Sequence, residues 1–123
     1  MSWEYNLVAS GKIDKAAIYS RDGDNILAQS DNFSLADQEI KSLVAGFEDP
    51  SSFLSSGLRL EDQTYRVTKA DDRGVYGKNG AEGALAVRTN QSILIAHYPA
   101  GVQAPEANTV VEKLADFLIM NNY

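Results

Sequence analysis

Apolar residues recur along this chain with two periods, which predict where helices and strands form. Ile40, Leu43, Val44 and Phe47 lie at helical spacing and share one face of a helix over about residues 35–48. We expect Ser34 to cap this helix, with Asp37 at the third position after the cap, and Asp49-Pro50 to end it. A second short helical turn around residues 53–54 is predicted to end at Gly57.

Two further helices are predicted at the ends of the chain. The first covers residues 3–8 and ends at Gly11. The second covers residues 106–121 and has Glu106 near its positive N-terminal end. Its apolar stripe consists of Val110, Val111, Leu114, Ala115, Phe117 and Leu118.

Short apolar or alternating segments elsewhere predict strands. Residues 16–19 and 26–28 flank the turn residues 22–25 and form a hairpin. Residues 64–68, 75–77, 84–89 and 92–98 follow, and the dipeptide Asn79-Gly80 is typical of a tight hairpin turn. Because the connections are short, the strands must pair antiparallel. The prediction is an α+β fold in one domain, residues 1–123, with a central antiparallel sheet.

The composition and motifs exclude most catalytic sites. The chain has no cysteine and one histidine, so it has no disulfide, no thiol nucleophile and no cysteine or multi-histidine metal centre. Gly74, Gly77, Gly80 and Gly83 fit turns better than a phosphate loop, and Asp22-Gly23-Asp24 lacks the rest of a calcium loop. Asp71-Asp72 fits a solvated turn, and His97 a structural histidine. We therefore expect a binding module with no catalytic residue, metal or cofactor.

Charge narrows the class of partner. The net charge of −6 disfavours nucleic acid, and the chain has neither a membrane-length apolar run nor a signal-peptide pattern, so we expect a cytoplasmic protein. We also expect a monomer. Six of the eleven basic residues lie within residues 59–88. They are either solvated charges on alternating strand positions or a local basic face that meets an acidic partner.

Several segments, in consistent order along the chain, resemble profilin, the actin-monomer-binding family. They are Met1-Ser2-Trp3, Ala16-Ala17-Ile18 before Asp22-Gly23, Asp49-Pro50, Gly57-Leu58, and residues 69–78 and 110–119, the last two being similar to amoebal profilins. The resemblance implies the N- and C-terminal helices side by side on one sheet face, with short helices on the other. It also implies binding of monomeric actin, cytoskeletal association and regulation of actin polymerisation. The alternative is a profilin-like interaction scaffold that does not bind actin.

The resemblance also implies two sites. The actin-binding face would include Lys69, Arg73, Lys78, Asn79, Asn108 and Lys113, with Tyr76 and Arg88 as weaker candidates. A site for proline-rich ligands would lie between the terminal helices and would use Trp3, Tyr5, Leu27, Phe117 and Tyr123.

Departures from the family pattern predict weaker binding of proline-rich ligands and of phosphoinositides. Leu27 stands where many profilins have tryptophan, and Phe117 where amoebal and fungal forms often have tyrosine; both lack a hydrogen-bond donor. The segment from Trp3 to Ala16 is about four residues short, one helical turn, which leaves the equivalence of Tyr5 open. We therefore expect weakened binding of proline-rich ligands. Phosphoinositide lipids should bind weakly or not at all, because the chain is acidic and Asn79 replaces a frequent lysine.

Overall fold

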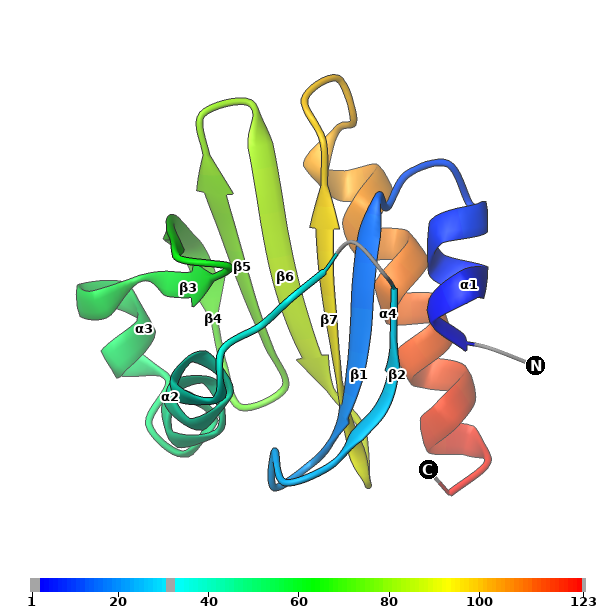
Figure 1. The fold of residues 1–123 in the computed structure, drawn as a ribbon, viewed down its shortest axis with the longest axis horizontal. Coiled ribbons are helices and arrows are strands. Elements are labelled where there is room, and N and C mark those ends of the chain that lie inside the picture. Colours follow the sequence, from blue (N-terminus) through cyan, green and yellow to red (C-terminus); the bar gives the residue numbers. More distant parts are fainter. Residues whose placement is uncertain (1–2, 31–32, 123) are drawn as a thin grey trace.

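The structure is a computed structural model that describes residues 3–30 and 33–122, with side chains from Asn6 onward. Seven strands form one antiparallel sheet in the order β2-β1-β7-β6-β5-β4-β3 (Figure 1). The strands are β1 (Lys15–Ser20), β2 (Ile26–Gln29), β3 (Leu58–Leu60), β4 (Gln63–Ala70), β5 (Gly74–Asn79), β6 (Glu82–Arg88) and β7 (Ser92–Tyr98). The helices are α1 (Trp3–Ala9), α2 (Asp37–Glu48), α3 (Ser51–Ser56) and α4 (Ala104–Met120).

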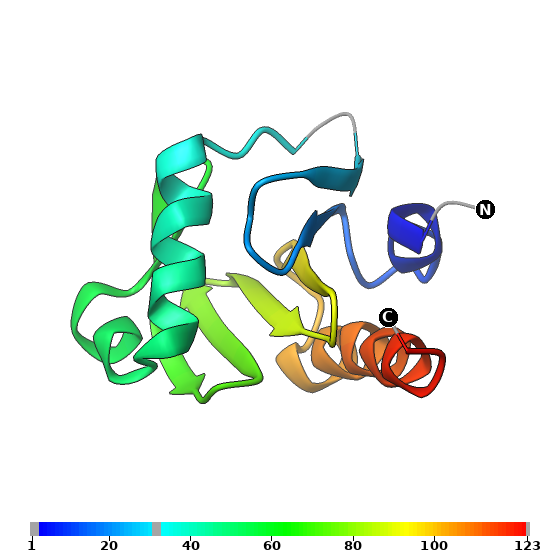
Figure 2. The same ribbon diagram turned by 90° about the horizontal axis from the view of Figure 1, so that it is seen from below.

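The helices cover the two faces of the sheet in pairs, α1 with α4 and α2 with α3 (Figure 2). Alternation along the strands divides the buried residues accordingly. Ala17 and Ile95 belong to the core under α2 and α3, together with Ile40, Phe47 and Phe53. On the other face, α1 and α4 cover a second core that contains Leu7, Ile18, Leu85, Leu94, Val111, Ala115 and Leu118. The predicted α+β architecture, including the distribution of its helices, is confirmed.

The start of α2 corrects the sequence interpretation. The residue before the helix is Ala36, in extended conformation, so Ser34 does not cap it. The side chain of Glu39, three residues further on, accepts the Ala36 N–H at 2.9 Å. The backbone N–H of Ser34 donates to the Glu61 carboxylate at 3.1 Å, which ties Ser34 to the β3–β4 turn and not to the start of the helix.

One histidine joins three segments at one end of the sheet. His97 on β7 is buried, with Nδ1 2.6 Å from the Asp14 carboxylate and Nε2 2.9 Å from that of Glu82 on β6. Both ring nitrogens have partners, as a structural histidine requires.

Among the helices described, none is long and apolar enough to cross a membrane.

Candidate functional site

A depression of about 410 Å³ lies where the first half of α4 crosses β4 and β5. It brings together three residues that the sequence analysis placed at an actin-binding face: Lys69 of β4, Tyr76 of β5 and Asn108 of α4. Thr68, Pro105, Thr109 and Glu112 complete its lining. Antiparallel pairing places Lys69 directly opposite Tyr76, while the first turns of α4 supply the far wall.

Tyr76 is the centre of this depression. Its hydroxyl donates to the Glu112 carboxylate of α4 at 2.7 Å, and the Lys69 ammonium lies 5.6 Å from its ring centroid. Burial, followed by the hydrogen bond to Glu112, raises the pKa of the Tyr76 hydroxyl well above its ordinary value. The hydroxyl is therefore a fixed donor to Glu112, and one face of the ring is in contact with the Lys69 ammonium.

Arg73, in the β4–β5 turn, is tied to α4 by an ion pair with Asp116. Glu112 and Asp116 are one helical turn apart, so the two carboxylates reach β5 and the adjoining turn from the same side of α4. The hydrogen bond to Asp116 raises the pKa of the Arg73 guanidinium, although burial opposes it. This pair orients Arg73 beside the depression and neutralises part of its charge.

The remaining polar candidates extend this surface in two directions. Lys113 is exposed on α4 and, within the described residues, forms no ion pair. Lys78 lies two residues beyond Tyr76 on β5, so it shares the face that α4 covers. Asn79 follows at the end of the strand, where its amide lies 3.4 Å from Gln63.

Arg88 lies away from this surface. At the end of β6 its guanidinium stacks 4.8 Å from the Phe47 ring centroid, is 3.6 Å from the Glu48 carboxylate and donates to the Asp72 carbonyl. Only 11% of its side chain is exposed. Arg88 therefore joins the end of α2 to the sheet, on the face opposite the one that carries Tyr76.

Little of the predicted site for proline-rich ligands falls on described side chains. α1 and α4 lie side by side on one sheet face (Figures 1 and 2). Phe117 on α4 and Leu27 on β2 are half exposed, at 53% and 57%, and are open to a ligand. The side chains of Trp3 and Tyr5, and all of Tyr123, lie outside the described residues.

Sequence reasoning missed the carboxylates that organise these surfaces. Glu112 and Asp116 are four residues apart on the predicted C-terminal helix, a spacing that places both on one side. That spacing could have suggested a pair aimed at a neighbouring element. The residues they bind, Tyr76 and Arg73, are 36 and 43 positions away and carry no local signal.

Comparison with known proteins agrees with the fold. The family model for profilin matches residues 1–123. A profilin of Saccharomyces cerevisiae is 48% identical over 126 residues and covers all of both chains. The crystallised profilin of Schizosaccharomyces pombe, 43% identical, superposes with a TM-score of 0.95 over 99% of this chain and 100% of its own.

A more distant structure shows the same fold. It is mouse profilin IIa in complex with a double repeat from the FH1 domain of mDia1, with a TM-score of 0.79 at 18% identity over 98% of this chain and 96% of its own. The antiparallel sheet with two helices on each face, the full-length family match and the relatives of more than 40% identity agree. This chain belongs to the profilin family.

Proposed function

We propose that this protein binds monomeric actin and regulates its polymerisation. The observation that carries the proposal is the depression in which Lys69, Tyr76 and Asn108 meet, because the family resemblance assigns all three to an actin-binding face. Arg73 and Lys113 border this depression, and Lys78 and Asn79 extend the surface along β5. Arg88, packed against α2, is not included.

Local charge would drive the encounter with actin. Actin is acidic and this chain carries a net charge of −6, so attraction between the whole molecules cannot steer them together. Attraction must come from the basic side chains on this face, over a Debye length of about 8 Å at physiological salt. The polar contacts of Tyr76 and Asn108 would then fix the orientation of the complex.

Charge reversal tests the surface. The triple variant Lys69→Glu, Arg73→Glu, Lys113→Glu should no longer co-elute with monomeric actin or slow pyrene-actin assembly. A matched triple, Lys12→Glu, Lys41→Glu, Arg59→Glu, changes the net charge equally at other places and should bind as the natural chain does. Equal affinities of the two triples would refute this surface. Failure of the natural chain itself to bind would favour the actin-independent scaffold.

A second ligand class is proline-rich segments, bound weakly between α1 and α4. A polyproline helix has a preset backbone and no N–H groups, so its carbonyls need donors from aromatic side chains. Leu27 and Phe117 present apolar area without donors. Each missing hydrogen bond costs roughly 0.5–1.5 kcal/mol, so two weaken binding about five- to 150-fold.

Restoring the donors tests that proposal. The variant Leu27→Trp, Phe117→Tyr should bind a proline decamer more tightly than the natural chain, as followed by isothermal titration calorimetry. Lys41→Trp, on the exposed side of α2, is the control and should not change the affinity. If the natural chain already binds as tightly as the restored variant, donors do not limit binding.

Phosphoinositides are proposed to bind weakly or not at all. The bases near the actin-binding face would each contribute on the order of 1 kcal/mol towards an anionic membrane, but the net charge opposes approach. Flotation with vesicles that contain phosphatidylinositol bisphosphate should therefore recover little protein at physiological salt. Strong flotation would contradict the charge argument.

A further inference from the structure

We propose that the outer edge of β4 binds an extended peptide with alternating acidic and apolar side chains, which adds to the sheet as an eighth strand. This edge is only half used. β3 pairs with Gln63, Thr64 and Tyr65, and among the described strands none pairs with the outer side of residues 66–70. Backbone donors and acceptors on such an edge are open to another chain.

The edge is free because of Gly57. With a φ of +79°, Gly57 joins the end of α3 to the start of β3, and its N–H donates to the Phe53 carbonyl at 2.8 Å. The residues before Leu58 therefore belong to α3 and do not pair with β4. A Cβ at this position would lie 3.0 Å from the Tyr65 carbonyl oxygen, so the turn passes close against β4. An added strand would lie in line with β3 and would pair with the part of β4 that β3 does not reach.

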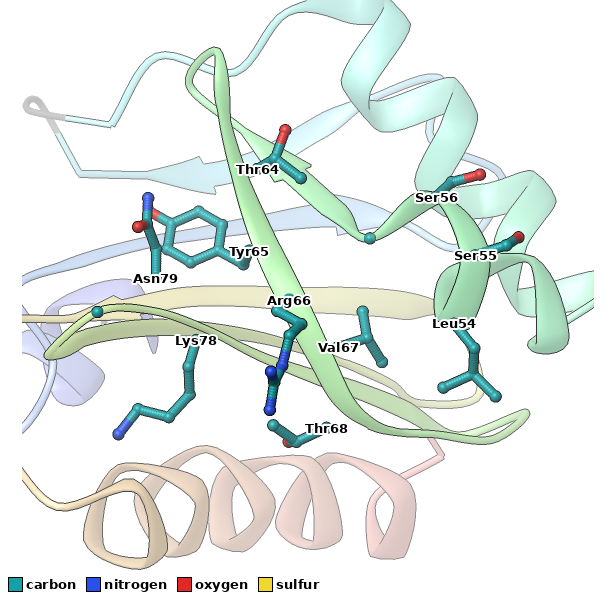
Figure 3. A pocket seen from close by; sticks show the side chains of 12 residues that line it. Leu54, Ser55, Ser56, Thr64, Tyr65, Arg66, Val67, Thr68, Lys78 and Asn79 are labelled. Atoms are coloured by element: carbon teal, nitrogen blue, oxygen red, sulfur yellow. The ribbon is translucent and has the colours of Figure 1, made fainter.

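The space beside this edge is a pocket of about 660 Å³ (Figure 3). Residues 64–68 of β4 form one side of it, the end of α3 from Leu54 to Gly57 forms a second, and Lys78, Asn79 and Gly80 form a third. Neighbouring strands lie about 4.8 Å apart, and five extended residues span roughly 17 Å. The groove therefore offers the unpaired backbone of β4 to an added strand, and side chains of α3 and β5 lie on either side.

Three basic side chains face one side of this edge. Arg66 lies opposite Lys78 in the strand register, and Lys78 shares the face of Tyr76, over which Lys69 lies. In Figure 3 the side chains of Arg66 and Lys78 point in the same direction. Within the described residues, none of the three bases forms an ion pair. A concentration of unpaired positive charge on an acidic chain selects an acidic ligand.

The other side of the edge carries two apolar side chains, next to the hydroxyls of Ser55 and Ser56 in α3. Val67 is half buried against the core under α2 and α3, and Leu54 at the end of α3 is 66% exposed. Successive side chains of an added strand point to opposite faces. The strand would therefore place acidic residues near Arg66 and Lys69 and apolar residues near Val67 and Leu54, which defines the alternating ligand.

A second copy of this chain does not fit the edge. Pairing of two β4 edges would bring Arg66, Lys69 and Lys78 of one molecule against the same bases of the other. The β-bulge at Thr68, where the β4–β5 register shifts, also bends the edge. The bulge affects any added strand, but the basic side chains repel a second copy and attract an acidic strand, so charge favours the acidic peptide.

The probe is a fluorescein-labelled peptide Glu-Val-Glu-Val-Glu-Val-Glu, titrated by fluorescence anisotropy against the full chain. We expect saturable binding, and NMR amide shifts that centre on residues 66–70. Arg66→Glu should weaken binding about tenfold or more, whereas Lys41→Glu on the exposed side of α2 should not. The peptide with lysine in place of glutamate should not bind.

Backbone pairing is tested in the peptide, so that the fold of the protein stays intact. N-methylation of every second residue blocks one edge of the strand, and methylation of the alternate set blocks the other. The isomer with its protein-facing edge blocked should lose binding, and the other should keep it. Equal binding of both isomers, shifts centred away from residues 66–70, or a β4-edge dimer of the free chain in sedimentation would each overturn the proposal.

Discussion

The carboxylate of Glu39 on α2 accepts the backbone N–H of Asp62 at 2.7 Å. The same side chain also accepts the N–H of Glu61 at 3.0 Å. Glu61 and Asp62 form the β3–β4 turn and have φ values of 51° and 63°, a conformation that residues with a side chain rarely adopt. One nearly buried carboxylate thus holds an unfavourable turn in place and joins α2 to the hairpin next to it.

Glu39→Gln should destabilise the fold. The amide replaces one of the two acceptor oxygens with a donor, so a backbone N–H loses its charged partner. Hydrogen bonds to charged groups contribute about 1.5–3 kcal/mol, and we expect a loss of that size in the free energy of unfolding measured with urea. Asp24→Asn, at an exposed carboxylate in the β1–β2 turn, is the control and should cost less than about 0.5 kcal/mol. Similar losses for both would show that the turn does not depend on Glu39.

Gly46→Ala should destabilise the contact between α2 and α3. An added Cβ would lie 2.3 Å from the Phe53 ring, which is buried and packs edge-on against Phe47. Overpacking typically costs 1–3 kcal/mol and outweighs the gain of about 1 kcal/mol in helix propensity.

The double variant Gly46→Ala, Phe53→Leu tests the cause of that loss. Leucine removes the outer ring atoms, and alanine fills part of the space, so the double variant should be more stable than the sum of the two single losses predicts. Additive losses in thermal unfolding would argue against a steric origin.

Asp116→Asn should strengthen the binding of monomeric actin, if the surface proposed above is correct. The change releases Arg73 from its ion pair and removes a negative charge three residues from Lys113 on α4. We expect a several-fold gain in affinity that shrinks as salt rises. Asp62→Asn breaks the ion pair with Arg59 elsewhere and serves as the control. A gain in both variants, or in neither, would contradict the local effect.

Stability should fall in alkaline solution, in part through Tyr65. Burial raises the pKa of its hydroxyl from 10 to about 12, and the nearby carboxylates add to the shift. Because the folded pKa lies above the unfolded one, the contribution of this group is complete below about pH 10 and is lost as pH rises towards 12. Tyr65→Phe should flatten the loss of urea stability between pH 9 and 11.

Other groups limit how much of this loss Tyr65→Phe can remove. The pKa values of Tyr76 and of Lys15, which donates to Glu61, are also raised, so part of the alkaline loss should remain. An unchanged slope in the variant would show that folding does not raise the pKa of the Tyr65 hydroxyl.

The sequence predicted elements better than their junctions. The helical face of Ile40, Leu43 and Phe47 and the hairpin dipeptide Asn79-Gly80 are local patterns, and both elements formed where predicted. The prediction that Ser34 caps α2 was wrong, because the backbone N–H of Ser34 donates to the carboxylate of Glu61, 27 positions away. A local propensity was overruled by a contact that only the folded sheet creates.

The candidate site also has parts that the sequence predicted and parts that it did not. The family resemblance named Lys69, Tyr76 and Asn108, and the fold brings them to one depression. The resemblance ranked Arg88 with Tyr76 as a weaker candidate and gave no reason to separate these two, because the direction of a side chain at the end of β6 depends on packing against Phe47. The half-paired edge of β4 has no signature at all, since it arises from where Gly57 turns the chain.

His97 has a practical consequence for studying this protein. It is the only histidine of the chain, so its ring protons give NMR signals that need no assignment strategy. The ring contacts Asp14 before β1 and Glu82 at the start of β6, and it lies edge-on to Tyr65 at 6.1 Å between centroids. One pair of resonances therefore reports on three separate stretches of chain. A ligand that separates these three segments would shift the His97 ring resonances in unlabelled protein. A ligand that binds only in the α4 depression would leave these resonances unchanged.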